Sequence, residues 1–268
     1  MAKYRVVAGG LTDIGQRRKN NEDYFCLEEK TGLFIVADGV GGSASGEIAS
    51  KMAADIIRDY INSDSNEEDI QAYEFYRPDY SLMTNKLSMA LMFANESIYK
   101  LANEQAKLKG MATTTVAGVI NNERLSVAHV GDSRLYLIRD NYIEQLTEDH
   151  SLVAEQIRRG LVDEESAKDS GMTNVITRSL GYVESVEVEM NELFLYDGDI
   201  ILLCSDGLHS MVTDNVMYQT VRSTKNPADA CQRLVHFANK KGGKDNITVI
   251  VAYIYKKRWF SFIFNLFK

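Results

Sequence analysis

The sequence predicts a layered α+β domain. Several strand-like segments follow one another through short polar connections such as INNERL and IRDNYI, which favours antiparallel pairing. Helical patterns occur in blocks between groups of strands rather than after each strand, so a repeated βαβ architecture is disfavoured. The 268 residues include only 2 prolines, which leaves no room for a proline-rich linker. The chain is long enough to bury a large core.

Strands are expected wherever short runs of apolar or alternating residues are bounded by polar turns. The runs LFIVA and IILLC are nearly continuous, which is typical of strands buried on both faces. The expected strands, in chain order, are 4–8, 24–28, 33–37, 114–120, 124–130, 134–139, 142–146, 186–195, 199–204 and 247–255.

Helices are expected over 46–60, 82–107 and 227–240, because each segment repeats apolar residues at helical spacing. Pro227 stands at a favourable first position of the last helix. The predicted inward face of the first helix consists of Ile48, Ala49, Met52, Ala53, Ile56, Ile57 and Tyr60.

Two polar segments interrupt these elements. Residues 62–80 are acidic and are expected to form a surface loop. Residues 151–176 are weakly patterned and contain glycine, which suits an excursion beside a functional site.

Composition and charge exclude several classes of protein. The net charge of −8 and the pI of about 5.2 argue against general nucleic-acid binding. Cys26, Cys204 and Cys231 show no metal-ligand spacing, and Cys204 is expected to be a buried thiol. The first residues lack the apolar region of a signal peptide, so the reducing cytoplasm is the expected compartment.

Four aspartates adjoin predicted buried strands. Asp38 ends LFIVAD, Asp206 follows IILLCS, Asp132 follows LSVAHVG, and Asp245 precedes NITVIVAYI. An ionised carboxylate at the end of a buried strand is unfavourable unless another charge compensates it. Carboxylate oxygens are the ligands of hard divalent cations, so the pattern suggests a metal site. The alternative is that Asp-Gly marks ordinary turns.

The segment TDIGQRRKNNEDYF places Arg18, Glu22 and Asp23 just before a strand. An arginine can bind phosphate oxygens through two parallel hydrogen bonds, and adjacent carboxylates can bind cations. Taken alone, this segment is better explained as an ordinary solvated run of charges, which also includes Arg17 and Lys19.

The glycine-rich segment ADGVGGSASGE follows the first of these aspartates. Gly39, Gly41 and Gly42 would let the backbone turn tightly, so that a carbonyl could join Asp38 as a ligand. The alternative is a phosphate-binding loop before a helix. The pattern GxxxxGK[ST] is absent, so the nucleotide-binding version of this alternative is weak.

Five motifs in this order, RxxNED, VADGVGG, GDSR, CSDGL and KDNIT, resemble the protein phosphatase 2C family over about residues 5–254. The bacterial branch fits better, because eukaryotic members carry a histidine where this chain has Val40. The resemblance implies a β-sandwich of two antiparallel sheets flanked by pairs of helices, a four-layer αββα arrangement. It also implies hydrolysis of phosphoserine and phosphothreonine by a metal-activated water, in opposition to a Ser/Thr kinase.

The resemblance implies a centre of two Mn²⁺ or Mg²⁺ ions, with a third in bacterial members. Asp38 matches the carboxylate that bridges two metals, and Gly39 the residue that supplies a carbonyl ligand. Asp206 and Asp245 match the ligands of one metal, while Asp132 matches the residue that holds the third metal with Asp206. Oxygen ligands alone agree with Mg²⁺ or Mn²⁺ rather than Zn²⁺.

Three further assignments follow from the same resemblance. Asp23 and Glu22 match an acidic pair that holds metal-bound waters, and Asp23 is counted among the metal-site residues. Arg18 matches the residue that grips the substrate phosphate. Residues 151–176 correspond to the flap beside the site.

The proton donor to the leaving group is left open. Val40 replaces the family histidine, Ala112 replaces a common glycine, and His209 is interpreted as non-catalytic. His129 and His150 lie near the motifs, although an isolated histidine is more often structural, and a metal-bound water could serve instead.

The last segment, KKRWFSFIFNLFK at 256–268, lies outside the resemblance, which assigns 1–255 to the phosphatase domain. It contains the only Trp and is too short to span a bilayer. It could lie at a membrane surface, contact a partner, or pack back onto the domain. A cytoplasmic enzyme, with or without peripheral membrane contact, is therefore expected. The rival functions are a non-catalytic binding relative and a phosphoesterase for small molecules.

Overall fold

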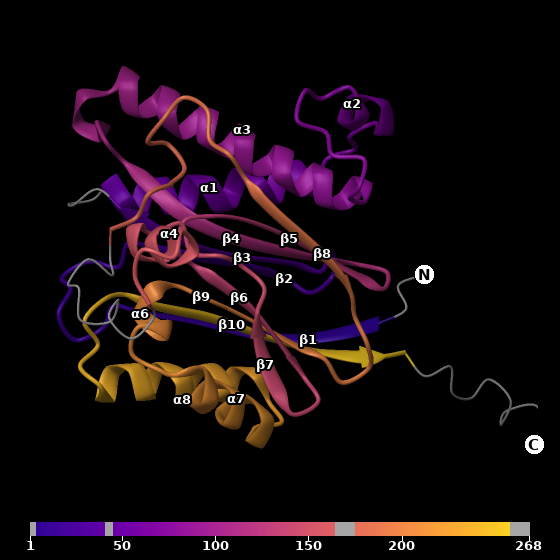
Figure 1. Cartoon of the computed structure of the whole chain (residues 1–268), viewed down its shortest axis with the longest axis vertical. Helices are drawn as coiled ribbons and strands as arrows, with labels where there is room; N and C mark the ends of the chain where they lie inside the picture. Colours follow the sequence, from indigo (N-terminus) through magenta and orange to yellow (C-terminus); the bar gives the residue numbers. More distant parts are fainter. Residues whose placement is uncertain (1–3, 41–44, 164–174, 258–268) are drawn as a thin grey trace, which may run out of the picture.

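Two five-stranded antiparallel sheets lie face to face with helices on both outer surfaces (Figure 1). This computed structural model describes residues 4–40, 45–163 and 175–257. The predicted β-sandwich of two antiparallel sheets flanked by helices is confirmed. None of the helices in these ranges is long and apolar enough to cross a membrane.

The first sheet has the strand order β1-β10-β9-β6-β7. The strand pair at one edge of this sheet joins segments from opposite ends of the chain, because β1 and β10 pair along their whole lengths. The strands are β1 (Tyr4–Asp13), β6 (Arg134–Arg139), β7 (Tyr142–Gln145), β9 (Ile200–Cys204) and β10 (Ile247–Lys256).

The second sheet has the order β2-β3-β4-β5-β8. Its first four strands are consecutive antiparallel neighbours, and the pairing of β4 with β5 is the one that the short connection INNERL predicted. The strands are β2 (Asp23–Glu28), β3 (Leu33–Val40), β4 (Ala112–Asn121), β5 (Arg124–Val130) and β8 (Glu189–Phe194).

A pair of helices covers each sheet. α1 (Ser45–Asn62) and α3 (Leu82–Glu104) pack on the second sheet, and α7 (Asp214–Ser223) and α8 (Pro227–Lys240) lie beneath the first (Figure 1). Shorter helices are α2 (Glu67–Gln71), α4 (Leu152–Arg158), α6 (Asp206–His209) and the 3₁₀ turn Ala106–Leu108.

Three apolar layers hold the sandwich together. The central layer lies between the sheets and includes Phe34, Val116 and Ile250. One outer layer joins α1 and α3 to the second sheet, and the other joins α7 and α8 to the first. Apolar runs buried on both faces therefore explain the continuous patterns LFIVA and IILLC.

Several predicted boundaries need correction. The expected helix 82–107 ends at Glu104 and continues only as a 3₁₀ turn. The expected loop 62–80 contains α2, and 151–176 begins with α4. Ile48 was predicted to face inward but is 39% exposed. The buried stripe of α1 runs through small residues such as Gly46, Ala49 and Ala53, which lets the helix approach the sheet closely and leaves Ile48 at the stripe's edge.

The strand carrying Asp38 also differs from the prediction. β3 continues through Asp38 and Gly39 to Val40, so Asp38 does not end the strand and Gly39 does not form a turn. Gly39 pairs with Thr113 of β4, and this extra pairing carries the strand past the carboxylate. Gly41 and Gly42 lie outside the described residues.

Candidate metal centre

The carboxylates of Asp23 and Asp38 come from neighbouring strands. Asp23 begins β2 and is the direct antiparallel partner of Asp38 on β3. Residues paired in this way project on the same face of a sheet, about 5 Å apart. Two like charges this close are unfavourable unless protons or cations compensate them.

Three more aspartates approach the same point from other elements. Burial raises the pKa of Asp38 well above its ordinary value, and the charges of four other aspartates raise it further. Asp206 lies in the first turn of α6, two residues beyond the end of β9, rather than at the strand end. The four residues acting on Asp38 are Asp23, Asp206, Asp132 and Asp245.

Burial changes the acidity of this cluster. The pKa of Asp23 rises to about 7, chiefly through burial, although hydrogen bonds from Thr248 and Ser205 lower it. Burial and then the charge of Asp206 raise the pKa of Asp132 to about 7. Burial and then the charge of Asp245 raise that of Asp206 to about 6. The fold therefore brings together more carboxylates than its own positively charged groups can neutralise.

Buried carboxylate oxygens without hydrogen-bond partners also indicate that a cation binds here. Oδ1 of Asp23, Oδ1 of Asp132 and Oδ1 of Asp206 are buried without a hydrogen-bond partner. Buried polar atoms are normally paired, so three unpaired carboxylate oxygens in one cluster need a ligand. Hard divalent cations prefer carboxylate oxygen, and the residues present therefore fit Mn²⁺ or Mg²⁺.

The two sheets are bridged directly beneath this cluster. Ser205 Oγ donates to Asp23 Oδ2 at 2.7 Å, and the Thr248 N–H donates to Ser205 Oγ at 3.0 Å. Ser205 therefore orients the Asp23 carboxylate from the opposite sheet. Ser205 was not predicted as a functional residue, although it stands immediately before Asp206 in the motif CSDG.

Gly39 is required for a close approach. Its N–H donates to the Glu22 carbonyl at 3.1 Å, which joins the Arg18 segment to β3. A Cβ at position 39 would lie 2.2 Å from the Gly46 carbonyl oxygen at the start of α1. The absence of a side chain lets the helix start press against the strand beside Asp38.

Arg18 lies at the exposed side of the cluster. Its Nη2 is 2.6 Å from Asp245 Oδ2, and its side chain is 52% exposed. The hydrogen bond with Asp245 is the largest cause raising the pKa of Arg18, and the charges of Asp38 and Glu22 also contribute. The guanidinium is therefore attached to the aspartate cluster and remains open to solvent.

Asn246 fixes the segment that carries Arg18. Its Oδ1 accepts from the Glu22 N–H at 2.8 Å, and its Nδ2 donates to the carbonyls of Ile14 and Asn20, each at 3.0 Å. Because Asn246 directly follows Asp245, these bonds hold the phosphate-binding candidate against the carboxylates. The motif KDNIT includes Asn246, but the sequence alone assigned it no role.

Asp132 lies where the chain crosses between sheets. β5 belongs to the second sheet and β6 to the first, so the segment around Asp132 joins two sheets and does not form a hairpin turn. Gly131 has a φ of 108°, a backbone conformation that favours glycine. Asp132 is 5% exposed, and its carbonyl is 3.0 Å from His209 Nε2. His209 is thus engaged with the backbone.

The histidines considered as proton donors are buried. His129 and His150 stack with ring centroids 4.8 Å apart. His129 Nε2 lies 2.7 Å from the Glu148 carbonyl, and His150 Nε2 lies 3.1 Å from Glu189 Oε1. These contacts give both rings structural partners.

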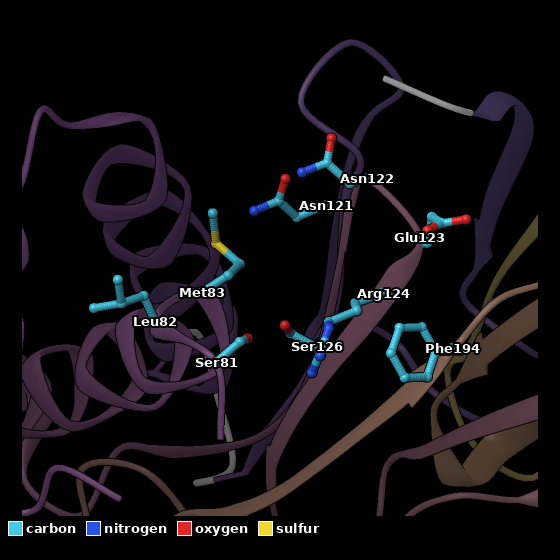
Figure 2. Close-up of a pocket in the computed structure, with 9 residues that line it drawn as sticks. All are labelled: Ser81, Leu82, Met83, Asn121, Asn122, Glu123, Arg124, Ser126 and Phe194. Carbon is cyan, nitrogen blue, oxygen red and sulfur yellow. The ribbon is translucent and has the colours of Figure 1, made fainter. Parts of the chain in front are cut away.

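A separate cavity of about 230 Å³ lies at the other end of the second sheet, between the start of α3 and the β4–β5 turn. Figure 2 shows Arg124 beside the ring of Phe194, with Ser81 and Met83 on the facing helix. Arg124 stacks over Phe194 at 4.5 Å and pairs with Glu192. This cationic group is therefore already engaged within the fold.

Comparison with known proteins identifies the family. The model of the family described as Protein phosphatase 2C matches residues 10–247. The chain belongs to the protein phosphatase 2C family. It is accordingly a protein phosphatase of a metal-dependent family, and the resemblance seen in the five motifs is confirmed.

Similar proteins of known name are serine/threonine phosphatases, in agreement with this family. The chain is 35% identical over 247 residues to the serine/threonine phosphatase stp of Listeria innocua, covering 90% of this chain and 93% of that protein. The Mycobacterium tuberculosis serine/threonine phosphatase PstP/Ppp has a TM-score of 0.81 and 31% identity, covering 93% and 99% of the two chains. The catalytic domain of a phosphatase named PstP, solved with two manganese ions, has a TM-score of 0.79 and 31% identity, covering 94% and 99%.

Proposed function

We propose that this chain removes phosphate from phosphoserine and phosphothreonine in proteins, using Mn²⁺ or Mg²⁺ held by the aspartate cluster. The observation that carries the proposal is the set of three buried carboxylates with an unpartnered oxygen beside the exposed Arg18. Two such cations, when bound, would activate water and stabilise the attacking and leaving oxygens of the phosphoester.

The metal-binding roles that we propose for the aspartates follow from how closely their side chains approach one another. Asp38 lies at the centre of the carboxylates and is the proposed bridge between cations. Asp132 is the proposed ligand of a third cation together with Asp206. The full set of proposed metal-site residues is Asp23, Asp38, Gly39 through its carbonyl, Asp132, Asp206 and Asp245.

Arg18 is the proposed phosphate-binding residue. Its planar guanidinium can donate two parallel hydrogen bonds to phosphate oxygens. Its present bond to Asp245 holds it at the rim of the cluster, and its exposure leaves room for a phosphoprotein. Binding there would orient the phosphate toward the carboxylates without any movement of the strands.

The test is hydrolysis of a phosphothreonine peptide with Mn²⁺, compared with nucleotides and sugar phosphates. We expect preference for the phosphopeptide and loss of activity in Asp38→Asn, in Asp206→Asn and in excess chelator. Asp140→Asn in the distant β6–β7 turn is the matched control, because a φ of 50° suits asparagine there.

Two outcomes would support the rival functions. Folded protein that binds Mn²⁺ and hydrolyses none of these compounds would indicate a non-catalytic relative. Faster turnover of nucleotides or sugar phosphates would indicate a small-molecule phosphoesterase. Activity that survives both substitutions or the chelator would contradict the metal centre.

We also propose that this enzyme opposes a Ser/Thr kinase in the cytoplasm. The support is chemical, since phosphoserine and phosphothreonine in proteins are products of such kinases. Deleting the phosphatase should raise the phosphorylation of a defined set of proteins, measured by phosphopeptide mass spectrometry. An unchanged set of phosphopeptides would contradict this role.

The proposed catalytic domain is 1–255, and we propose that 256–268 binds an anionic membrane surface. Lys256 is in fact the last residue of β10, and 258–268 lie outside the described residues. Ten strand residues at about 3.3 Å each separate Lys256, which precedes this segment, from the β10 end beside Asp245, a length of roughly 30 Å.

Vesicle sedimentation tests the tether. The full chain should sediment with phosphatidylglycerol vesicles but not with phosphatidylcholine vesicles, and a chain lacking 258–268 should remain in solution with both. Equal sedimentation of the two chains would contradict membrane binding, and capture of a protein through 258–268 without vesicle binding would replace it with a protein contact.

A further inference from the structure

His150 lies where three parts of the chain meet. Its N–H donates to the Gly131 carbonyl at 3.0 Å, and its ring Nδ1 accepts from the Gly131 N–H at 3.1 Å. Its carbonyl accepts from the Thr177 N–H at 2.8 Å. One buried residue thus joins the β5–β6 crossover to both flanks of residues 151–176.

The hydrogen bonds define the form of this ring. Since Nδ1 accepts from a backbone N–H, the ring proton must be on Nε2, which donates to Glu189 Oε1 at 3.1 Å. Glu189 is ionised, because this hydrogen bond is the largest cause lowering its pKa. The two ring nitrogens therefore have different partners, and Arg178 Nη1 lies 3.5 Å from both His150 Nε2 and Glu189 Oε1.

Such a ring is unsuited to metal binding. His129, His150 and Glu189 place possible ligand atoms within 4.8 Å of one another. A histidine ligand must offer a free lone pair, and Gly131 already occupies the lone pair of His150. His129 Nε2 is likewise engaged with the Glu148 carbonyl. The cluster is therefore better explained as an anchor.

The anchored residue adjoins a proposed metal ligand. Gly131 precedes Asp132, whose carbonyl contacts His209 at 3.0 Å. Ser133, on the other side, hydrogen-bonds Thr114 through the two hydroxyls at 2.8 Å. Three consecutive residues are thus each tied to a different element, while Oδ1 of Asp132 is left without a partner.

We propose that His150 is a positioning residue that, by clamping both backbone groups of Gly131, holds the Asp132 carboxylate in place for a divalent cation. The inference rests on the proposed function only in taking Asp132 as a ligand. Position 131 favours glycine independently of the clamp, because a Cβ there would lie 2.4 Å from Thr114 Cβ and its φ is positive.

Two substitutions test the hydrogen bonds of the two ring nitrogens one at a time. In His150→Asn, Oδ1 takes the place of Nδ1 and can accept from Gly131, whereas the bond to Glu189 is lost. In His150→Gln, Nε2 can donate to Glu189, whereas the acceptor for Gly131 is lost. Each variant therefore removes one of the two hydrogen bonds of the ring and keeps the other.

Mn²⁺ binding measured by calorimetry is the main readout. We expect His150→Gln to weaken the Asp132-dependent binding step about tenfold and His150→Asn to change it less than about twofold, a contrast typical of one buried hydrogen bond. In an Asp132→Asn background His150→Gln should cause no further loss. Thermal unfolding of each variant identifies any that fails to fold.

The proposal is overturned if His150→Gln binds Mn²⁺ as the wild type does, if His150→Asn is as weak as His150→Gln, or if the loss persists without Asp132. Hydrogen exchange of the Gly131 amide in metal-free protein reports the clamp itself, and should be faster in His150→Gln than in His150→Asn. Wild-type protein that binds Mn²⁺ without hydrolysing phosphopeptides would contradict only the proposed function.

Discussion

Arg18 connects the buried carboxylates to solvent. Its guanidinium is bonded to Asp245 yet half exposed, and Asn246 holds its segment in place through Glu22, Ile14 and Asn20. A charge–charge hydrogen bond of this exposure contributes little to stability. Its position is therefore better explained by phosphate binding than by folding.

Replacing Arg18 should affect substrate binding more than folding. Arg18→Lys keeps the charge but loses the paired donors, so we expect KM for a phosphopeptide to rise roughly tenfold with a smaller change in kcat. Arg18→Ala should lose more. Steady-state kinetics measure both, with exposed Arg17→Ala as the control within about twofold of wild type. An Arg18→Lys enzyme indistinguishable from wild type would contradict the role.

The individual aspartates could be predicted from sequence, but their supports could not. Asp38, Asp132, Asp206 and Asp245 adjoin apolar runs, a pattern visible in the chain itself. Ser205 and Asp23 are 182 positions apart, and His150 contacts Gly131 across a sheet crossover. Only the packing of two sheets brings such pairs together.

Among the elements, strands were predicted more completely than helices. All ten strands were expected, because each contains an apolar run or an alternating pattern bounded by polar turns. α2 and α6 are too short for a helical repeat to be recognised. α7 was missed although Thr213 and the spacing of Met217, Thr220 and Val221 indicate a helix. β3 was ended too early, because Asp-Gly favours turns locally while pairing with β4 extends the strand.

The stability of helix α8 depends on its N-cap residue, Asn226, which precedes the first helical residue. The Asn226 side chain accepts from the Ala228 N–H at 3.0 Å, and Pro227 occupies the first turn. Loss of such a cap costs about 1 kcal/mol, so Asn226→Ala should lower the free energy of unfolding by about that amount. Urea denaturation measures it, and Asn226→Ser, which keeps an acceptor, is the control. Equal midpoints for the two variants would contradict the cap.

Across the whole molecule, the buried carboxylates make metal-free stability fall as pH rises. Asp23 and Asp132 have a pKa of about 7 in the folded protein, against about 3.9 when unfolded. Between these values the native state binds more protons, so the free energy of unfolding decreases with pH. His129 and His209, with a pKa lowered to about 4 by burial, act oppositely below about 6.5.

Cations should therefore stabilise the enzyme most at a pH where the free carboxylates have lost their protons and repel one another. We expect the rise in Tm caused by Mn²⁺ to grow from pH 5 to pH 7.5, because cations and protons compete for the same oxygens. Thermal unfolding with and without Mn²⁺ measures this, and Asp132→Asn should show a smaller dependence. A rise in Tm that is the same at every pH would contradict it.

The most direct test of the account is a Mn²⁺ titration of wild type and Asp38→Asn by calorimetry, followed by phosphothreonine-peptide hydrolysis on the same samples. We expect the wild type to bind at least two ions and to hydrolyse the peptide. Asp38→Asn should stay folded, lose the tight binding step and lose activity by at least about 100-fold, as expected when one charge-stabilising group is removed. Unchanged Mn²⁺ binding and turnover in Asp38→Asn would contradict the metal centre.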